Sequence, residues 1–182
     1  QMSVNISPSH FESPEFVDTV ARTVRESGIV PACLEIEITE SMTRDPQRHV
    51  EACLALQKIG VRIAIDDFGT GYSSLSVLKH MPIDTLKLDR QFIHDMALDD
   101  ASAVMTGTII GLASGLKLVV VAEGVETIEQ VQVLTGLGCT MAQGYYFCRP
   151  APADRILELK EFNFLDDPAA HPAASPVALE PM

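Results

Sequence analysis

Short apolar runs alternate with longer segments of mixed polarity along most of this chain. The short runs, such as LEIEIT and RIAIDD, are rich in β-branched residues, which is typical of strands in a parallel sheet. Strands are expected at residues 2–7, 34–39, 62–67, 85–89, 117–124 and 141–147. The segments between them place apolar residues at helical spacing. The pattern therefore predicts a succession of β-α units around a parallel sheet.

The expected helices have recognisable first and last residues. Ser13 precedes Pro14 at a first helical position. Asp45 and Thr127 occupy cap positions, and Gly60 follows the end of a helix. Helices are expected at residues 14–27, 46–59, 73–81, 103–115, 128–138 and 153–162. The even spacing of the units favours an α/β fold of the TIM-like (β/α) barrel type. Such a barrel has eight strands, so the chain is expected to hold about six of its eight units.

Composition narrows the class of protein. The 182 residues, 47% of them hydrophobic, suffice for one domain, expected over residues 1–163. Residues 164–182 are expected to be a disordered tail or a remnant of the expressed sequence. The net charge of −12 argues against a nucleic-acid polymer as partner, because phosphate backbones need clustered Lys and Arg. No apolar run reaches the roughly 18 residues of a membrane span, so a cytoplasmic protein without membrane contact is expected. The cysteines lack C-x-x-C spacing, which favours reduced thiols.

The run IAIDDFGTGYSSL joins a short apolar strand to a glycine-rich loop through two adjacent carboxylates. At the C-terminal end of a strand the pleat breaks up, so Asp66 and Asp67 can both reach one cation. A solvated turn with an Asp cap explains the same residues equally well. Gly69 and Gly71 leave the backbone free to approach a ligand or to move.

Polar residues recur at or near the C-terminal end of each expected strand, where barrel enzymes have their active sites. They are Asn5, Glu37, Asp66, Lys87, Glu123 and Gln143. Carboxylate and amide oxygens without His or Cys favour Mg²⁺ or Mn²⁺ over Zn²⁺. An Asp shared between two ions would suit in-line displacement at phosphorus, with Lys87 orienting a water or meeting developing charge. Any single one of these residues is equally well a cap or a satisfied core polar group.

Several segments, in this order and spacing, resemble the EAL-domain family of cyclic-di-GMP phosphodiesterases: SVNIS, LEIEITES, IAIDDFGTGYSSL, LKLDRQFI, VVVAEGVET and AQGYYFCRP. The resemblance runs from about Met2 to Phe162. It implies a barrel that hydrolyses cyclic di-GMP to linear pGpG with two Mg²⁺ or Mn²⁺ ions.

The resemblance also implies roles for individual residues. Asn5, Glu37 and Asp66 match the ligands of a first metal. Asp66, Asp67 and Glu123 match those of a second. Lys87 matches the lysine that positions the water, so Lys87 and Glu123 are the expected catalytic residues. Near the site, Gln143 matches a glutamine, and Asp89, expected on the strand of Lys87, matches the acidic residue of a KLD motif.

The glycine loop, with Gly69, Thr70 and Gly71, is similar to a family loop that couples dimerisation to metal and substrate binding. Glu40 matches the glutamate that holds this loop, although a role in a turn or cap accounts for it equally well. The resemblance therefore implies a homodimer with cyclic di-GMP as substrate. Sensory or cyclase-like domains are expected upstream.

The chain departs from the family pattern at its start. It opens without an initiator Met at what would be the third strand, so it is expected to be a piece of a longer protein. The Glu-Ala-Leu segment, whose glutamate would complete the first metal site, is absent. Six strands would also leave two open edges. Three hypotheses follow: a phosphodiesterase whose isolated chain is inactive, a receptor that binds cyclic di-GMP without hydrolysing it, or a scaffold that does not bind it.

Overall fold

The computed structural model describes residues 1–40, 42, 46–69 and 75–154, with the backbone alone for 46–48 and 75–77. Thr70, Gly71, the cap Asp45, nearly all of the expected helix at 153–162 and the tail at 164–182 lie outside the described residues. The described elements, in chain order, are β1 (Met2–Asn5), α1 (Pro8–Phe11), α2 (Phe16–Ser27), the 3₁₀ helix η1 (Pro31–Cys33), β2 (Leu34–Thr39), α3 (Pro46–Ile59), β3 (Arg62–Phe68), α4 (Leu75–His80), β4 (Thr85–Leu88), α5 (Arg90–Asp95), α6 (Asp100–Gly115), β5 (Val119–Glu123), α7 (Ile128–Gly136) and β6 (Met141–Gln143).

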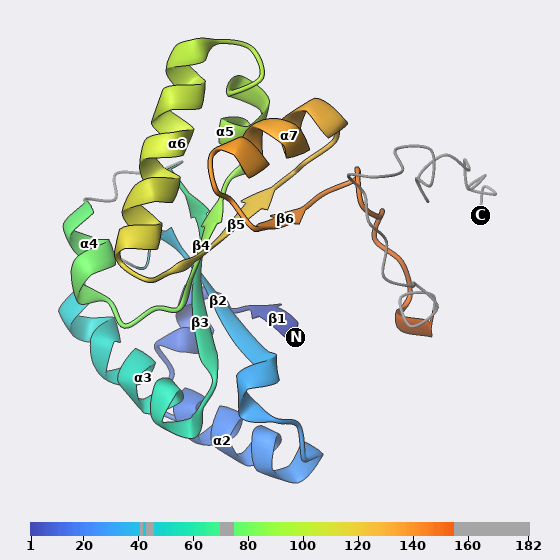
Figure 1. Cartoon of the computed structure of the whole chain (residues 1–182). Helices are drawn as coiled ribbons and strands as arrows, with labels where there is room; N and C mark the ends of the chain where they lie inside the picture. The colour runs from blue at the N-terminus through green and yellow to red at the C-terminus, as the bar shows by residue number, and fades with distance from the viewer. Residues whose placement is uncertain (41, 43–45, 70–74, 155–182) are drawn as a thin grey trace.

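Within the described residues, six strands form one parallel sheet in which each strand pairs with the next along the chain. Crossover connections between parallel strands are right-handed, so an unchanging strand order places the helices on one side of the sheet. Figure 1 shows the sheet curled, with the helices around its outer side. A doubly wound sheet would instead reverse its strand order. The predicted barrel-type fold is confirmed as a curled half-barrel of six strands.

The two faces of this sheet differ in polarity. The side chains that face the helices are buried and apolar: Ile36, Ile38, Ile63, Ile65, Leu86 and Leu88. Alternate residues of these strands and of β5 face the concave inner side, and most of the large ones are polar: Glu35, Glu37, Asp66, Thr85, Lys87 and Glu123. Each buried Ile or Leu contributes about 1.5–3 kcal/mol to folding. The hydrophobic core therefore lies between the sheet and the helices, and the polar side chains of the inner face are available to form a functional site.

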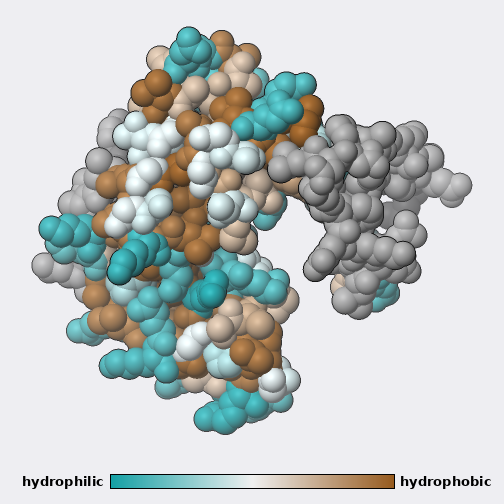
Figure 2. Space-filling view, in the orientation of Figure 1, coloured by the Kyte–Doolittle hydropathy of each residue, from teal (hydrophilic) through white to brown (hydrophobic). Residues whose placement is uncertain are grey.

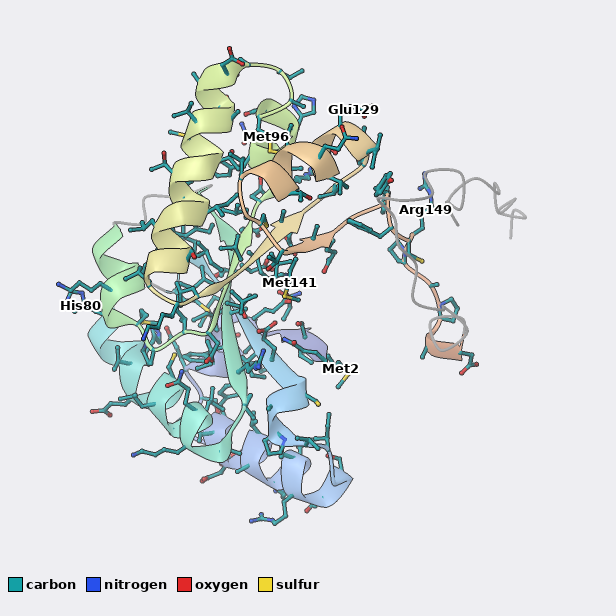
Figure 3. The ribbon with its side chains drawn as sticks, in the orientation of Figure 1. Met2, His80, Met96, Glu129, Met141 and Arg149 are labelled. Carbon is teal, nitrogen blue, oxygen red and sulfur yellow. The ribbon has the colours of Figure 1, made fainter. Side chains whose placement is uncertain are left out.

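The sheet has two unpaired edges among the described strands. Every residue of β1 and of β6 is exposed, whereas every residue of β4, in the middle, is buried. Figure 3 labels Met2 on β1 and Met141 on β6, which mark these edges. A hollow of about 610 Å³ lies on the inner face between them, lined by side chains such as Ser3, Glu35 and Thr85. The predicted open edges are confirmed.

Several local predictions are confirmed. Gly60, in the left-handed region with φ 94°, follows the last residue of α3. Thr127 is the N-cap of α7 and forms a capping box. Its hydroxyl oxygen accepts the Gln130 N–H, and Gln130 Oε1 accepts the Thr127 N–H. Both signals depend on residues within one turn of the helix end, and for this reason the sequence reveals them.

Other predicted boundaries are wrong. Helix α2 begins at Phe16, not at Pro14, because the Ser13 carbonyl accepts the Phe16 N–H in a turn that precedes the helix. Strand β4 ends at Leu88, and Asp89 is the N-cap of α5, where its carboxylate accepts the Gln91 N–H at 2.8 Å. Asp89 is therefore not on the strand of Lys87, and the short helices α1 and α5 were not expected.

Three further boundaries moved for local reasons. β5 starts at Val119 because Lys117 has a φ of 63°, outside the extended region. β6 ends at Gln143 because the Gly144 carbonyl accepts the N–H groups of Phe147 and Cys148 in a turn. Helix α6 starts at Asp100, three residues earlier than expected, with Asp99 as its N-cap.

Three further features concern membrane spans, exposed apolar side chains and the cysteines. No helix among the described residues is both long and apolar enough to cross a membrane. Figure 2 shows pale and hydrophobic atoms over α6, where Val104 and Met105 are exposed. All four cysteines are free thiols, as their spacing indicates.

Candidate active site

Lys87 lies at the centre of a buried cluster of carboxylates. Its Nζ is 2.8 Å from Glu37 Oε2, 2.9 Å from Asp66 Oδ1 and 2.7 Å from Glu123 Oε1. The four side chains come from β2, β3, β4 and β5, which are neighbours in the sheet. Three negative charges therefore surround one positive charge, and the cluster attracts further cations.

Strand register explains why these residues meet. Residues two apart on a strand share a face, and paired residues of adjacent parallel strands lie side by side. Glu37 pairs with Ala64, which is two residues before Asp66 on the same face of β3. Lys87 pairs with Val121, which stands in the same relation to Glu123 on β5. The alternating pattern of each strand thus directs all four polar side chains to the inner face.

The paired aspartates depend on a break in this regular pattern. The pairing of β3 with β4 shifts between Ile65 and Phe68, and Asp67 has a φ of 54°, which is uncommon for a residue other than glycine. Without this irregularity, Asp66 and Asp67 would point to opposite faces. Instead, one carboxylate oxygen each of Asp66, Asp67 and Glu123 lies within 4.8 Å of the others. The expected convergence of the two aspartates at the strand end is present.

These residues fit a divalent metal. All three are hard oxygen donors, which Mg²⁺ and Mn²⁺ prefer. Asp66 Oδ1 is buried and accepts no well-directed hydrogen bond within the described part of the chain, so its contact with Lys87 is an ion pair. An oxygen in this state has lone pairs to offer to a cation. Asp66, Asp67 and Glu123 therefore form a possible metal site.

The cluster changes the proton affinity of its members. Burial alone lowers the pKa of Lys87, but the contacts with Glu123, Glu37 and Asp66 outweigh it, and the net pKa lies well above the usual value. Burial raises the pKa of Glu123, and Asp66 and Glu37 add to the shift, against the opposing effect of Lys87. Burial also raises the pKa of Asp67, reinforced by Asp66 and Asp89. Lys87 is consequently a fixed cation, while Glu123 and Asp67 take up protons at a higher pH than ordinary carboxyl groups.

Asn5 and Gln143 flank the cluster from the edge strands. Asn5 pairs in register with Glu37, and Gln143 with Glu123. Each therefore faces the same side of the sheet as its partner. Both are exposed because they lie on β1 and β6, the two edges of the described sheet.

Glu40 contacts the start of the glycine loop. Its buried carboxylate accepts the Gly69 N–H at 2.6 Å. Gly69 has a φ of 100°, and a Cβ at this position would overlap the ring of Phe92 on α5. The first glycine of the loop is thus contacted from two sides, by Glu40 directly after β2 and by Phe92 on α5. A role in coupling dimerisation to the site stays a prediction.

The structure adds residues that the sequence did not single out. A cleft of about 460 Å³ at the C-terminal strand ends is lined by Asp67, Asp89, Arg90, Glu123, Gly124, Glu126, Gln143, Gly144 and Tyr145. Arg90 fits there because Gly124 lacks a Cβ, which would overlap the Arg90 side chain. Its position directly after Asp89 was the available signal.

A second layer lies beneath the cluster. Buried Glu35 accepts hydrogen bonds from Thr85 Oγ1 at 2.6 Å and from Ser3 Oγ at 3.0 Å. The alternation in LEIEIT places Glu35 on the same face as Glu37, and this was the signal that could have revealed it. The hydroxyl groups satisfy the carboxylate, so Glu35 stabilises the inner face next to the site.

Several known proteins are similar to this chain in sequence. A family model described as EAL domain matches residues 1–150. The bifunctional diguanylate cyclase/cyclic di-GMP phosphodiesterase MucR of Pseudomonas aeruginosa is 42% identical over 157 residues, which are 86% of this chain and 23% of MucR. The chain spans about a fifth of the length of the curated relatives it matches.

Solved structures agree with the fold. The PaMucR phosphodiesterase in complex with c-di-GMP aligns with a TM-score of 0.80 at 42% identity, covering 85% of this chain and 63% of that one. BlrP1 of Klebsiella pneumoniae, in a calcium/cy-diGMP complex, aligns with a TM-score of 0.77 at 31% identity, covering 83% and 39%. The half-barrel, its acidic inner face and these matches lead to one conclusion: the chain belongs to the EAL domain family.

Proposed function

We propose that this protein hydrolyses one phosphodiester bond of cyclic di-GMP to give linear pGpG, with two Mg²⁺ or Mn²⁺ ions. The observation that carries the proposal is the Lys87 ammonium among three carboxylates, with Asp67 beside them. The match to a phosphodiesterase relative supports the substrate class. The alternatives are a receptor that binds cyclic di-GMP without hydrolysing it, and a scaffold that does not bind it.

Each polar side chain has a part in this proposal. Asn5, Glu37 and Asp66 would hold one ion, and Asp66, Asp67 and Glu123 the other. The ions, when bound, neutralise phosphate charge and lower the pKa of a coordinated water. Asp66 would be the shared ligand, because β3, which carries it, lies between β2 with Glu37 and β5 with Glu123 in the sheet.

Lys87 acts as a hydrogen-bond donor in this scheme. Its raised pKa keeps the ammonium charged at neutral pH, so it cannot remove a proton. A charged donor at this place orients the attacking water and opposes negative charge that develops on the phosphoryl oxygens. The same charge excludes Lys87 as a general base. Gln143, in register with Glu123, lies at the rim of the site.

Features of the whole protein stay predictions. They include a homodimer, sensory or cyclase-like domains upstream, and a glutamate that would complete the first metal site. The isolated chain is expected to be inactive, since its inner face ends at two unpaired strands.

A hydrolysis assay tests the proposed function. The parent protein, with its natural sequence before Gln1, would be incubated with cyclic di-GMP and Mn²⁺ or Mg²⁺, and pGpG would be measured by chromatography. Metal-dependent product is expected, with loss of activity in Glu123→Ala. Glu51→Ala is the matched control, because Glu51 is exposed on α3, away from the cluster. Tight binding of cyclic di-GMP without pGpG formation would contradict the enzyme hypothesis and support the receptor hypothesis.

A further inference from the structure

We propose that Gln130 is a positioning residue for the candidate site: it joins α5 to the segment between β5 and α7, and so holds two parts of the cleft lining in place. The inference rests on the proposed function, because it concerns the geometry in which the substrate would be hydrolysed. Gln130 lies in the first turn of α7 and is only 7% exposed. A polar side chain buried to this extent needs hydrogen-bond partners, and those of Gln130 come from two different elements.

Both ends of the Gln130 amide form hydrogen bonds. Its Oε1 accepts the Glu126 N–H at 2.7 Å and the Thr127 N–H at 3.1 Å. Its Nε2 donates to the Ile93 carbonyl of α5 at 3.3 Å. Figure 1 shows α7 beside α5. The bonds of Oε1 belong to the start of α7, whereas the bond to Ile93 has no part in the cap and connects α7 to α5.

The two joined segments line the cleft beside the acidic cluster. Arg90 of α5 lines it from one segment, and Gly124 and Glu126 line it from the other. The segments also touch directly, because a Cβ on Gly124 would overlap the Arg90 side chain. Gln130 is not among the residues that line the cleft. It therefore acts on the cleft through the segments that it joins.

Helix α5 has a particular need for such a bond. It is six residues long, and a helix this short has little stability of its own. The last four carbonyls of a helix lack partners within the helix, and the carbonyl of Ile93 is one of them in α5. Ile93 is fully buried, so water is a poor substitute for the Gln130 amide. The bond thus stabilises the position of α5 and of Arg90 at its start.

Two substitutions in the parent protein separate the contact with α5 from the cap of α7. Gln130→Glu keeps an oxygen for the Glu126 and Thr127 N–H groups but loses the N–H that the Ile93 carbonyl accepts. Thr127→Ala is the matched control. It removes the hydroxyl that accepts the Gln130 N–H at 3.3 Å and leaves the contact with Ile93.

Amide hydrogen exchange, measured by mass spectrometry at about pH 8, reports on both helices. At this pH the introduced carboxyl group is ionised and cannot donate to Ile93. Exchange in α5 should be about tenfold faster in Gln130→Glu, the equivalent of one lost hydrogen bond, and within about twofold of native in Thr127→Ala. Exchange in α7 should show the reverse pattern.

Hydrolysis of cyclic di-GMP gives a second measurement. A displacement of about 1 Å at a reacting centre can slow a reaction about 10²-fold, so kcat should fall at least about tenfold in Gln130→Glu. It should stay within about twofold of native in Thr127→Ala. Gln130→Ala removes both contacts, so it should loosen both helices and slow hydrolysis. This variant replaces Gln130→Glu if the buried carboxylate unfolds the protein.

The outcomes separate the inference from the proposed function. Unchanged exchange in α5 of Gln130→Glu would overturn the inference, because the bond to Ile93 would then not hold the helix. Faster exchange with a native kcat would also overturn it, since Gln130 would then support the fold alone. A native parent protein without activity would overturn the proposed function, and the exchange rates would still decide whether Gln130 holds α5.

Discussion

The two faces of the same strands obey opposite rules. On β3 and β4, the side chains of Ile63, Ile65 and Leu86 face the helices in an apolar layer. Directly after Ile65 and Leu86 in sequence, Asp66 and Lys87 face the inner side in a cluster of charges. The same strands thus carry an apolar layer that stabilises the fold and a charged layer in which the carboxylates repel one another. The residues that form the core and the residues that form the candidate site therefore alternate along the same strands and do not lie in separate segments.

The strongest test of this division is Asp66→Asn in the parent protein. The substitution keeps the shape but removes the charge that both ions are proposed to share. Hydrolysis of cyclic di-GMP should fall about 10³-fold, since metal stabilisation of the transition state is worth several kcal/mol. The melting temperature should hardly change or should rise, because a repulsive charge is lost. Asp18→Asn, at an exposed site on α2, is the control for both measurements. A variant that unfolds would break the comparison.

The complementary test is Ile63→Ala on the outer face. Removing this fully buried side chain should lower the free energy of unfolding by about 3 kcal/mol, through lost burial and a cavity. Urea denaturation measures the change, with the exposed Leu54→Ala as the matched control. The folded variant should bind Mn²⁺ with native affinity. Reduced metal affinity in the folded protein would show that the two faces are coupled.

Gly69→Ala tests the packing at the end of β3, where the glycine loop begins beside Phe92 of α5. Both the φ of 100° and the overlap with Phe92 oppose a Cβ, so a loss of about 2 kcal/mol in stability is expected. Gly28→Ala separates the two causes, because Gly28 also has a positive φ, 69°, but open space around it. Its loss should be about 1 kcal/mol. Equal losses in the two variants would mean that the packing against Phe92 contributes nothing.

The smallest expected effect is a dependence on pH. Glu123 and Asp67 have raised pKa values, so they take up protons at a higher pH than ordinary carboxyl groups. Mn²⁺ affinity should therefore fall up to about tenfold between about pH 7 and pH 5. In the metal-free protein the sign reverses: a folded-state pKa above the unfolded value means that these groups add stability as the pH falls through it. Calorimetry and thermal unfolding measure the two trends, and Glu123→Gln should weaken both.

Much of the fold follows from local signals. The alternation in LEIEIT marks β2 with its observed bounds, and the caps at Gly60 and Thr127 mark helix ends, because each signal acts within a few residues. Asp89 shows the limit, since a carboxylate after a strand can continue it or cap the next helix. That choice depends on the hydrogen bond to Gln91, which sequence patterns do not specify.

The residues of the candidate site could be predicted from the sequence, but the contacts among them could not. Strand order alone groups Glu37, Asp66, Lys87 and Glu123, because parallel strands end on the same side. The three contacts of Lys87, in contrast, require the register of four strands at once. Arg90 and Tyr145 were missed because they reach the cleft through close packing at Gly124 and Gly144, which only the folded chain reveals.

Lys87 also determines how the protein responds when metal is scarce. Its ammonium is an internal counter-ion, covalently attached, in the place where dissociable cations are expected. Zinc fingers unfold without metal because nothing replaces the ion. Here the attached cation keeps the carboxylates from repelling one another apart. Under the proposed function, metal supply would then set the rate of hydrolysis, while the amount of folded protein would stay constant.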